Sequence, residues 1–200
     1  MTEPTTLHIQ QKLTLMVNQY WIRTADPAGN PGDVLAYAQQ KRMKLREEVT
    51  FYSDDSKTRV LFGFKSRQVI DMAATTDVFD ADHMPIGVFR KDAVKSLLNS
   101  TWHIQSGPVT ATGRERSQNV AVFRRFSGFI PIVGDVLEMI PWQFHFDFVD
   151  GGGATILSVE RQRKIRDNYV LTLRPDSAGT VLDWRFAAAL GVALDAFQGR

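Results

Sequence analysis

Residues 183–199 read DWRFAAALGVALDAFQG, a helix-forming stretch that is apolar on almost every side, whereas the rest of the chain is patterned as short strands. Such a helix needs hydrophobic surroundings, which either a bilayer or enclosing strands supply. The run from Trp184 to Phe197 spans about 21 Å, against a bilayer core of about 30 Å. Its charged residues, Arg185 and Asp195, would each cost about 2.5 to 3.5 kcal/mol at mid-membrane. We therefore predict a core helix enclosed by strands rather than a membrane anchor.

The two faces of this helix differ in bulk. Asp183 stands where an N-cap belongs, and Gly199 lies just past the end. Large side chains recur at helical spacing on one face, and small residues with one aspartate lie opposite. The large set is Phe186, Leu190, Leu194 and Phe197, and the opposite set is Ala188, Gly191 and Asp195. A helix that is thin on one side fits inside a narrow barrel.

The composition predicts one domain. The 200 residues are 44% hydrophobic, which is enough for one core, and no linker divides residues 1–200; we place the core at about 15–198. Residues 1–13 lack the basic and apolar segments of a secretory signal. The absence of cysteine excludes disulfides, thiolate nucleophiles and cysteine-bound zinc. We expect a cytoplasmic protein whose net charge of +2 leaves any attraction to anionic partners to local clusters.

Strand-like runs recur along the chain, separated by turn-forming Asp, Gly, Asn, Ser and Pro. They read LTLMVNQYWIRTA, DVLAYAQQ, EVTFYS, RVLFGFKS, TTDVFD, IGVFRK, TWHIQS, NVAVFRRF, WQFHFDFV, ATILSVER and NYVLTLR. About eleven strands at this spacing predict a mainly β barrel or sandwich. Asp26, Asp80 and Asp150 each end a strand and open a glycine-containing turn, which predicts three comparable hairpins.

Two segments depart from the strand pattern. We expect a helical turn in KDAVKSLL, between Arg90 and Asn99. Residues 126–141, FSGFIPIVGDVLEMIP, are apolar but interrupted by glycine and proline. This pattern favours a loop or short helix that covers one end of the barrel. A loop that touches a membrane is the alternative.

The chain also contains an internal repeat. Residues 41–52, KRMKLREEVTFY, align without gaps to residues 161–172, RQRKIRDNYVLT, and after one inserted residue the match resumes at Asp55 and Asp176. We infer that two related segments help to build the barrel. Strand side chains alternate between the two faces of a sheet, and corresponding residues of the two copies should point to the same face. The expected inner set is Leu45, Val49 and Phe51, and the expected outer set is Lys44, Arg46 and Tyr52.

Several motifs together resemble the LURP-one-related proteins, which are grouped with the phospholipid scramblases and the tubby C-terminal domain. They are the strand-ending aspartates with their turns, the basic segments QQKRMKLR and RQRKIR, the strand RVLFGFKS and, most specifically, LDWRFAAALGVALDA at 182–196. The resemblance runs from about residue 15 to the end of the chain. It implies an antiparallel barrel of about twelve strands threaded by a hydrophobic C-terminal α-helix.

The activities that the resemblance implies are less specific. Tubby domains bind phosphoinositide headgroups through surface Lys and Arg, and scramblases move lipids with a calcium-binding acidic segment and acylated cysteines. This chain has no cysteine, and only Asp176 and Asp183 precede the helix where an acidic segment would lie. Scramblase-like lipid transfer is therefore an alternative to headgroup binding.

The basic segments are the main candidate binding site. If the repeats adjoin, their cations form a patch for anionic headgroups, each contributing about 1 kcal/mol near a charged membrane. A solvated strand face whose charges pair with neighbouring carboxylates is the competing interpretation. Arg124 and Arg125, followed by Phe129 and Ile130, form a second candidate, a loop in peripheral membrane contact. The headgroup candidates are Lys41, Arg42, Lys44, Arg46, Arg161, Arg163, Lys164 and Arg166.

Metal and catalytic patterns are missing from the sequence. The four histidines have no metal-ligand spacing, and we expect His103 and His145 to be ordinary strand residues. Asp77, Asp80 and Asp82 lack the central glycine and the glutamate of a calcium loop, so turn chemistry explains them better. No GxSxG elbow and no phosphate loop occur.

These absences lead us to expect a binding module that is not an enzyme and holds no metal or cofactor. The expected partner is an anionic membrane surface or another protein. A nucleic-acid binder that stacks bases on Tyr37 and Tyr52 is an alternative, and its affinity would fall steeply with salt.

Overall fold

The computed structural model describes residues 5–13, 17–41, 48–67, 75–92, 101–116, 145–163 and 167–198. These residues form twelve β-strands and one α-helix. The elements are β1 (Thr6–Leu13), β2 (Val17–Ala25), β3 (Pro31–Lys41), β4 (Glu48–Tyr52), β5 (Val60–Ser66), β6 (Thr75–Asp80), β7 (Pro85–Lys91), β8 (Thr101–Ser106), β9 (Val109–Glu115), β10 (His145–Asp150), β11 (Thr155–Arg163), β12 (Asp167–Leu173) and α3 (Trp184–Gln198).

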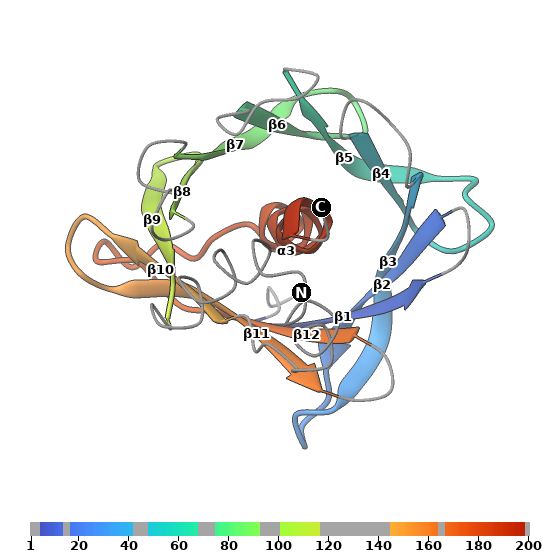
Figure 1. Ribbon diagram of the computed structural model, residues 1–200, viewed down its shortest axis with the longest axis horizontal. Helices are drawn as coiled ribbons and strands as arrows, with labels where there is room; N and C mark the ends of the chain where they lie inside the picture. Colours follow the sequence, from blue (N-terminus) through green and yellow to red (C-terminus); the bar gives the residue numbers. More distant parts are fainter. Residues whose placement is uncertain are drawn as a thin grey trace, which may run out of the picture.

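The strands close into an antiparallel barrel (Figure 1). Each strand pairs with the strands before and after it in the chain, and β1 pairs with β12 to complete the ring, with Ile9 opposite Tyr169. Closure pairs the backbone groups of every strand, because a closed sheet has no edge. The predicted mainly β fold, an antiparallel barrel of about twelve strands, is confirmed.

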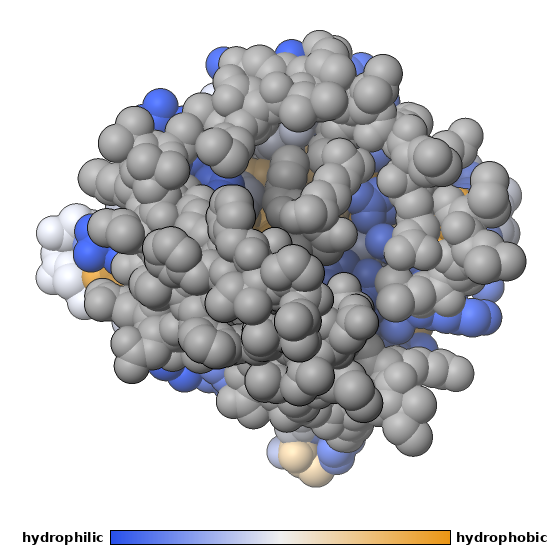
Figure 2. Space-filling model, viewed as in Figure 1, coloured by the Kyte–Doolittle hydropathy of each residue, from blue (hydrophilic) through white to orange (hydrophobic). Residues whose placement is uncertain are grey.

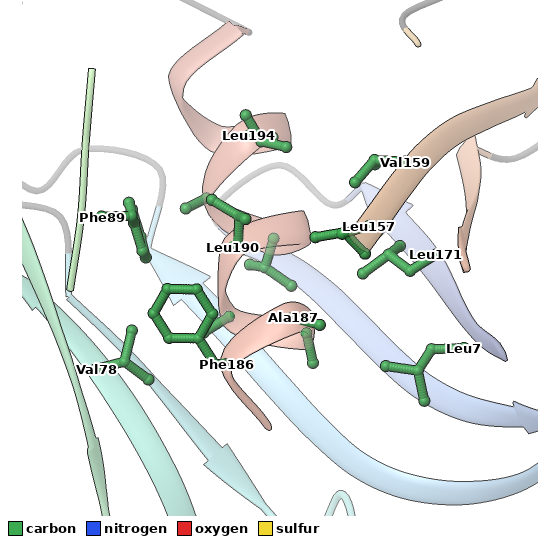
Figure 3. Close-up of a cluster of buried hydrophobic side chains, with 14 of the residues drawn as sticks. Leu7, Val78, Phe89, Leu157, Val159, Leu171, Phe186, Ala187, Leu190 and Leu194 are labelled. Carbon is green, nitrogen blue, oxygen red and sulfur yellow. The ribbon is translucent and has the colours of Figure 1, made fainter. Parts of the chain in front are cut away.

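Helix α3 lies inside the ring of strands, where Figure 1 shows it end-on. Ala187 and Leu190 are fully buried. Figure 3 shows Phe186 pointing toward Phe89, while Leu171 lies on the other side of the helix. In the view of Figure 1, Figure 2 shows hydrophobic residues at the centre of the molecule with hydrophilic residues beside them. The prediction of a helix enclosed by strands is confirmed.

The thin face of α3 packs against β1 and β12. A Cβ added at Gly191 would lie 2.6 Å from the Cδ1 of Ile9 and 3.0 Å from the Cδ2 of Leu171, so only glycine permits this approach. The helix begins at the predicted N-cap, where the Oδ1 of Asp183 accepts a 2.8 Å hydrogen bond from the backbone N–H of Arg185. Within the described residues, no helix combines the length and hydropathy needed to cross a bilayer.

Four turns at the end of the barrel where α3 begins share one aspartate motif. In each turn, the Oδ1 of the aspartate accepts hydrogen bonds from the backbone N–H groups two and four residues later. The third residue after the aspartate has a positive φ, and these residues are Gly29, His83, Gly153 and Gly179. The predicted turns at Asp26, Asp80 and Asp150 are confirmed, although the turn at Asp80 has His83 in place of the expected glycine. Asp176 opens a fourth turn with the same motif.

The internal repeat corresponds to two hairpins, β3–β4 and β11–β12. Val49 and Phe51 are buried, as are Tyr169 and Leu171 of the second copy, in agreement with the predicted inner face. Leu45, Lys44 and Arg46 lie outside the described residues. The copies diverge after the next turn, because the first continues into β5 and the second into α3.

The structure contains two strands that the sequence patterns do not single out, β1 and β9. In β9, VTATGRE has only small residues at its central inward positions, so its hydrophobic alternation is weak. The cause is packing, since a Cβ at Gly113 would lie 2.2 Å from a ring carbon of Phe148. The expected strand at 119–126, the loop at 126–141 and most of the expected helical turn, 93–98, lie outside the described residues.

Candidate functional site

The predicted basic segments can be placed only in part. Lys41 ends β3, Arg163 ends β11, and β12, β1 and β2 lie between those two strands in the sheet order. Arg161 pairs with Tyr169, whose buried hydroxyl bonds to Asp195 of α3. Paired residues share a face of the sheet, so Arg161 belongs to the inner face. The remaining headgroup candidates, Arg42, Lys44, Arg46, Lys164 and Arg166, lie outside the described residues, as do Arg124, Arg125, Phe129 and Ile130.

A different site is described on the outer face of β7 to β10, where a groove of about 920 Å³ lies across the four strands. This volume is within the usual range for small-ligand pockets. The side chains that line it come mainly from the outward positions of the strands. The polar and charged residues among them include Arg90, His103, Thr112, Arg114, Arg116 and Asp147.

Arg90 and Arg114 supply free positive charge to the groove. Both side chains are exposed, and in the described part of the chain neither makes an ion pair or a hydrogen bond. Strand register brings them together: Arg90 is opposite His103, and His103 is opposite Thr112, two residues before Arg114. Directly opposed Cβ atoms lie roughly 5 Å apart and diagonal ones roughly 7 to 8 Å apart. Two long guanidinium side chains therefore flank the ring of His103.

His103 connects the two arginine strands through hydrogen bonds. Its Nε2 lies 3.3 Å from the Oδ2 of Asp92, just after β7, and its Nδ1 lies 3.3 Å from the Oγ1 of Thr112 on β9. The side chains of His103 and Asp92 are 32% and 21% exposed, so the pair remains open to solvent. The imidazole is thus held in a fixed orientation at the floor of the groove. The expectation that His103 is a strand residue is confirmed, but its position in a polar groove was not predicted.

The other end of the groove is electrostatically neutralised. Arg116 donates two 2.8 Å hydrogen bonds to Asp147 and a 3.2 Å bond to Glu160. These bonds from Arg116, followed by one from Ser158, hold the pKa of Asp147 below its ordinary value, despite the opposing effect of burial. Hydrogen bonding to Asp147 likewise raises the pKa of Arg116. Arg116 is therefore committed to its carboxylates, which leaves Arg90 and Arg114 as the cations available to a ligand.

The groove offers charge and hydrogen bonding, and the described residues contain no group of three metal-ligating side chains. Asp77, considered above for calcium, instead accepts two hydrogen bonds from Arg67, at 2.8 and 2.9 Å. The sequence does carry a partial signal for the groove, because TWHIQS places the polar residues Thr101, His103 and Gln105 at alternate positions. The sequence does not show that β8 pairs with β7 on one side and with β9 on the other. That pairing brings together Arg90, His103 and Arg114, which are remote in the chain.

The fold defines the class of protein: a closed antiparallel barrel built around its own C-terminal helix. The model of the LURP-one-related family matches residues 34–195, which include every strand of the groove and most of α3. The chain therefore belongs to the LURP-one-related family. No curated protein matches it, and no solved structure does.

Proposed function

We propose that this barrel is a non-enzymatic binding module that holds anionic phospholipid headgroups at the surface of a membrane, in the cytoplasm. The observation that carries the proposal is the pair Arg90 and Arg114, two exposed cations that line the groove and make no ion pair within the described residues. The proposal places headgroup binding on β7 to β9 and does not require the repeated basic segments.

Arg90 and Arg114 differ from Arg116 in whether their charge is already paired. A guanidinium that already pairs with a carboxylate gains little from a second anion, whereas a free one forms a charge-assisted hydrogen bond with phosphate. Arg116 is of the first kind, and Arg90 and Arg114 are of the second. The interior of the barrel is occupied by α3 and its buried neighbours, so the outer groove is the better place for a polar ligand.

Vesicle flotation tests the proposal. The full chain is mixed with phosphatidylcholine vesicles that contain either phosphatidic acid or phosphatidylglycerol at matched mole fractions, or neither. We expect flotation with anionic vesicles that weakens as salt rises, and a loss of about tenfold to a hundredfold in affinity for the Arg90→Gln/Arg114→Gln variant.

The matched control is Arg59→Gln, which removes one exposed cation from the turn between β4 and β5, outside the groove. It should leave flotation nearly unchanged. Equal loss in the control, or equal binding to neutral vesicles, would contradict the proposal. A steep salt-dependent shift of an oligonucleotide instead of vesicles would favour a nucleic-acid binder.

A further inference from the structure

The hydrogen bonds of His103 determine what Thr112 can offer a ligand. The Asp92 carboxylate only accepts hydrogen bonds, so the Nε2 of His103 carries a proton and donates a hydrogen bond to Oδ2. When the imidazole is neutral, its Nδ1 is an acceptor and receives a hydrogen bond from the hydroxyl of Thr112. Only the lone pairs of that hydroxyl then remain for the groove, and lone pairs repel an anion.

Protonation of His103 reverses this arrangement. Both ring nitrogens become donors, so Nδ1 donates to the Oγ1 of Thr112 and the hydroxyl proton is released to point into the groove. Thr112 changes from an acceptor into a donor for the ligand. One proton on the imidazole thus adds a positive charge and a hydrogen-bond donor at the same place.

The charges around the imidazole indicate which anion would stabilise its protonated form. Among the described residues, the charged groups nearest to it are Arg90 on β7, Asp92 after β7 and Arg114 on β9; Asp147 on β10 is already paired with Arg116. Arg90, Arg114 and Asp92 sum to one positive charge, and a protonated His103 makes two. A phosphate monoester carries about −1.5 to −2 near neutral pH, and a diester carries one negative charge.

We propose that the groove binds a phosphate monoester, and that His103 takes up a proton when the monoester binds. This inference rests on the proposed function for the location of the site and goes beyond it in the chemistry of the ligand. The three terminal oxygens of a monoester meet Arg90, Arg114 and the Thr112 hydroxyl. A diester has only two free oxygens and lacks the charge to hold the proton on the imidazole.

The first experiment is isothermal titration calorimetry of the full chain with glycerol 3-phosphate, repeated in buffers of different ionisation enthalpy. The observed enthalpy should vary with the buffer in the direction of proton uptake, approaching about one proton per site. Imidazole changes charge between about pH 5 and 8, and the second ionisation of a phosphate monoester lies near pH 6. Affinity should therefore rise as the pH falls from about 8 toward 6.5, and decline below about 6.

Two variants isolate the mechanism. His103→Gln keeps a neutral hydrogen-bonding side chain, so it should abolish proton uptake and flatten the pH profile above about pH 6.5. Thr112→Val removes the released donor and should weaken binding about tenfold or more. The control is His83→Asn in the turn between β6 and β7, because asparagine tolerates the positive φ of that position. It should retain full proton uptake.

Vesicles separate the lipid source of a monoester from a free one. Stronger flotation with phosphatidic acid than with phosphatidylglycerol, lost in His103→Gln, supports both proposals. Equal flotation with the two lipids overturns the monoester inference and leaves membrane binding intact. Binding of glycerol 3-phosphate with proton uptake, but without flotation, supports the monoester inference and overturns membrane binding. Glycerol 3-phosphate binding without proton uptake overturns the inference.

Discussion

The hydroxyl of Tyr20, on β2, donates a 2.8 Å hydrogen bond to the carboxylate of Asp195, on α3. The side-chain amide of Gln11 donates to the same oxygen at 2.6 Å, and the hydroxyl of Tyr169 bonds to the other oxygen. Burial, reinforced by the negative charge of Asp195, raises the pKa of Tyr20, so the phenol remains a donor. One carboxylate thus attaches the helix to β1, β2 and β12.

We predict that Tyr20→Phe lowers the free energy of unfolding by about 1.5 to 3 kcal/mol, because a hydrogen bond to a charged group is lost inside the barrel. Urea denaturation of Tyr20→Phe, Asp195→Ala and the double variant measures the coupling between the two residues. A coupling of about 0.5 to 3 kcal/mol is expected for groups in contact. Additive effects would show that the hydrogen bond contributes nothing to stability.

Gly191 is the position where α3 comes closest to β1 and β12. Gly191→Leu should lower the free energy of unfolding by about 1 to 3 kcal/mol or more, because Ile9 and Leu171 are buried and cannot yield without moving their neighbours. Gly151→Ala is the control: a Cβ there meets nothing within 4 Å, and a change within about 0.5 kcal/mol is expected. Normal stability of the leucine variant would mean that the helix is not enclosed.

The turn residue at positive φ differs among the four aspartate turns. Gly153 has a φ of 90°, and a Cβ there meets no atom within 4 Å, so Gly153→Ala tests backbone strain alone. The variant should lose about 1 to 2 kcal/mol of stability. The reciprocal change, His83→Gly, should relieve strain and raise the melting temperature, less any contribution from the contact of His83 with the ring of Phe79. Thermal denaturation should therefore show a lower melting temperature for Gly153→Ala and a higher one for His83→Gly, each compared with the parent.

Asp150 connects two turns, because its Oδ2 accepts a 2.7 Å hydrogen bond from the backbone N–H of Ser177. Hydrogen bonds from Ser177, and then from the backbone of Ala154 and Gly152, lower the pKa of Asp150 to about 2. Its contribution to stability is therefore present above about pH 4 and is lost as the pH falls toward about 2.

We predict that Asp150→Asn is less stable than the parent at neutral pH, and that the difference shrinks as the pH falls from about 4 to about 2. The denaturation midpoint measured across this pH range tests the prediction. Asp33→Asn, at an exposed position on β3, is the control and should leave the pH profile of the parent unchanged. A difference that stays constant with pH would exclude a titrating Asp150 as the cause.

Much of the fold follows from local patterns. The all-round apolar helix, its Asp183 cap and the turns at Asp26 and Asp150 each depend on residues close together in the chain. Strand β9 does not, because Gly113 is explained only by Phe148, which lies on the neighbouring strand β10. Its small residues hide the alternation that would otherwise mark a buried strand.

The groove on β7 to β10 was not predicted from the sequence for a related reason. Clusters of like charge are visible along the sequence, and such clusters predict a binding site at Lys41, Arg161 and their neighbours. The register then places Arg161 on the inner face, opposite Tyr169. Arg90 and Arg114, on two separate strands, become a pair only because β8 lies between β7 and β9.

The sequence by itself determined that the C-terminal helix must be enclosed, because its length is too short for a bilayer and its apolar surface is too extensive for water. It also determined the aspartate turns, whose hydrogen bonds span only four residues. Tertiary structure alone decided which outward side chains meet. Register is a property of paired strands, and it brings Arg90, His103, Thr112 and Arg114 to one groove while it commits Arg116 to Asp147.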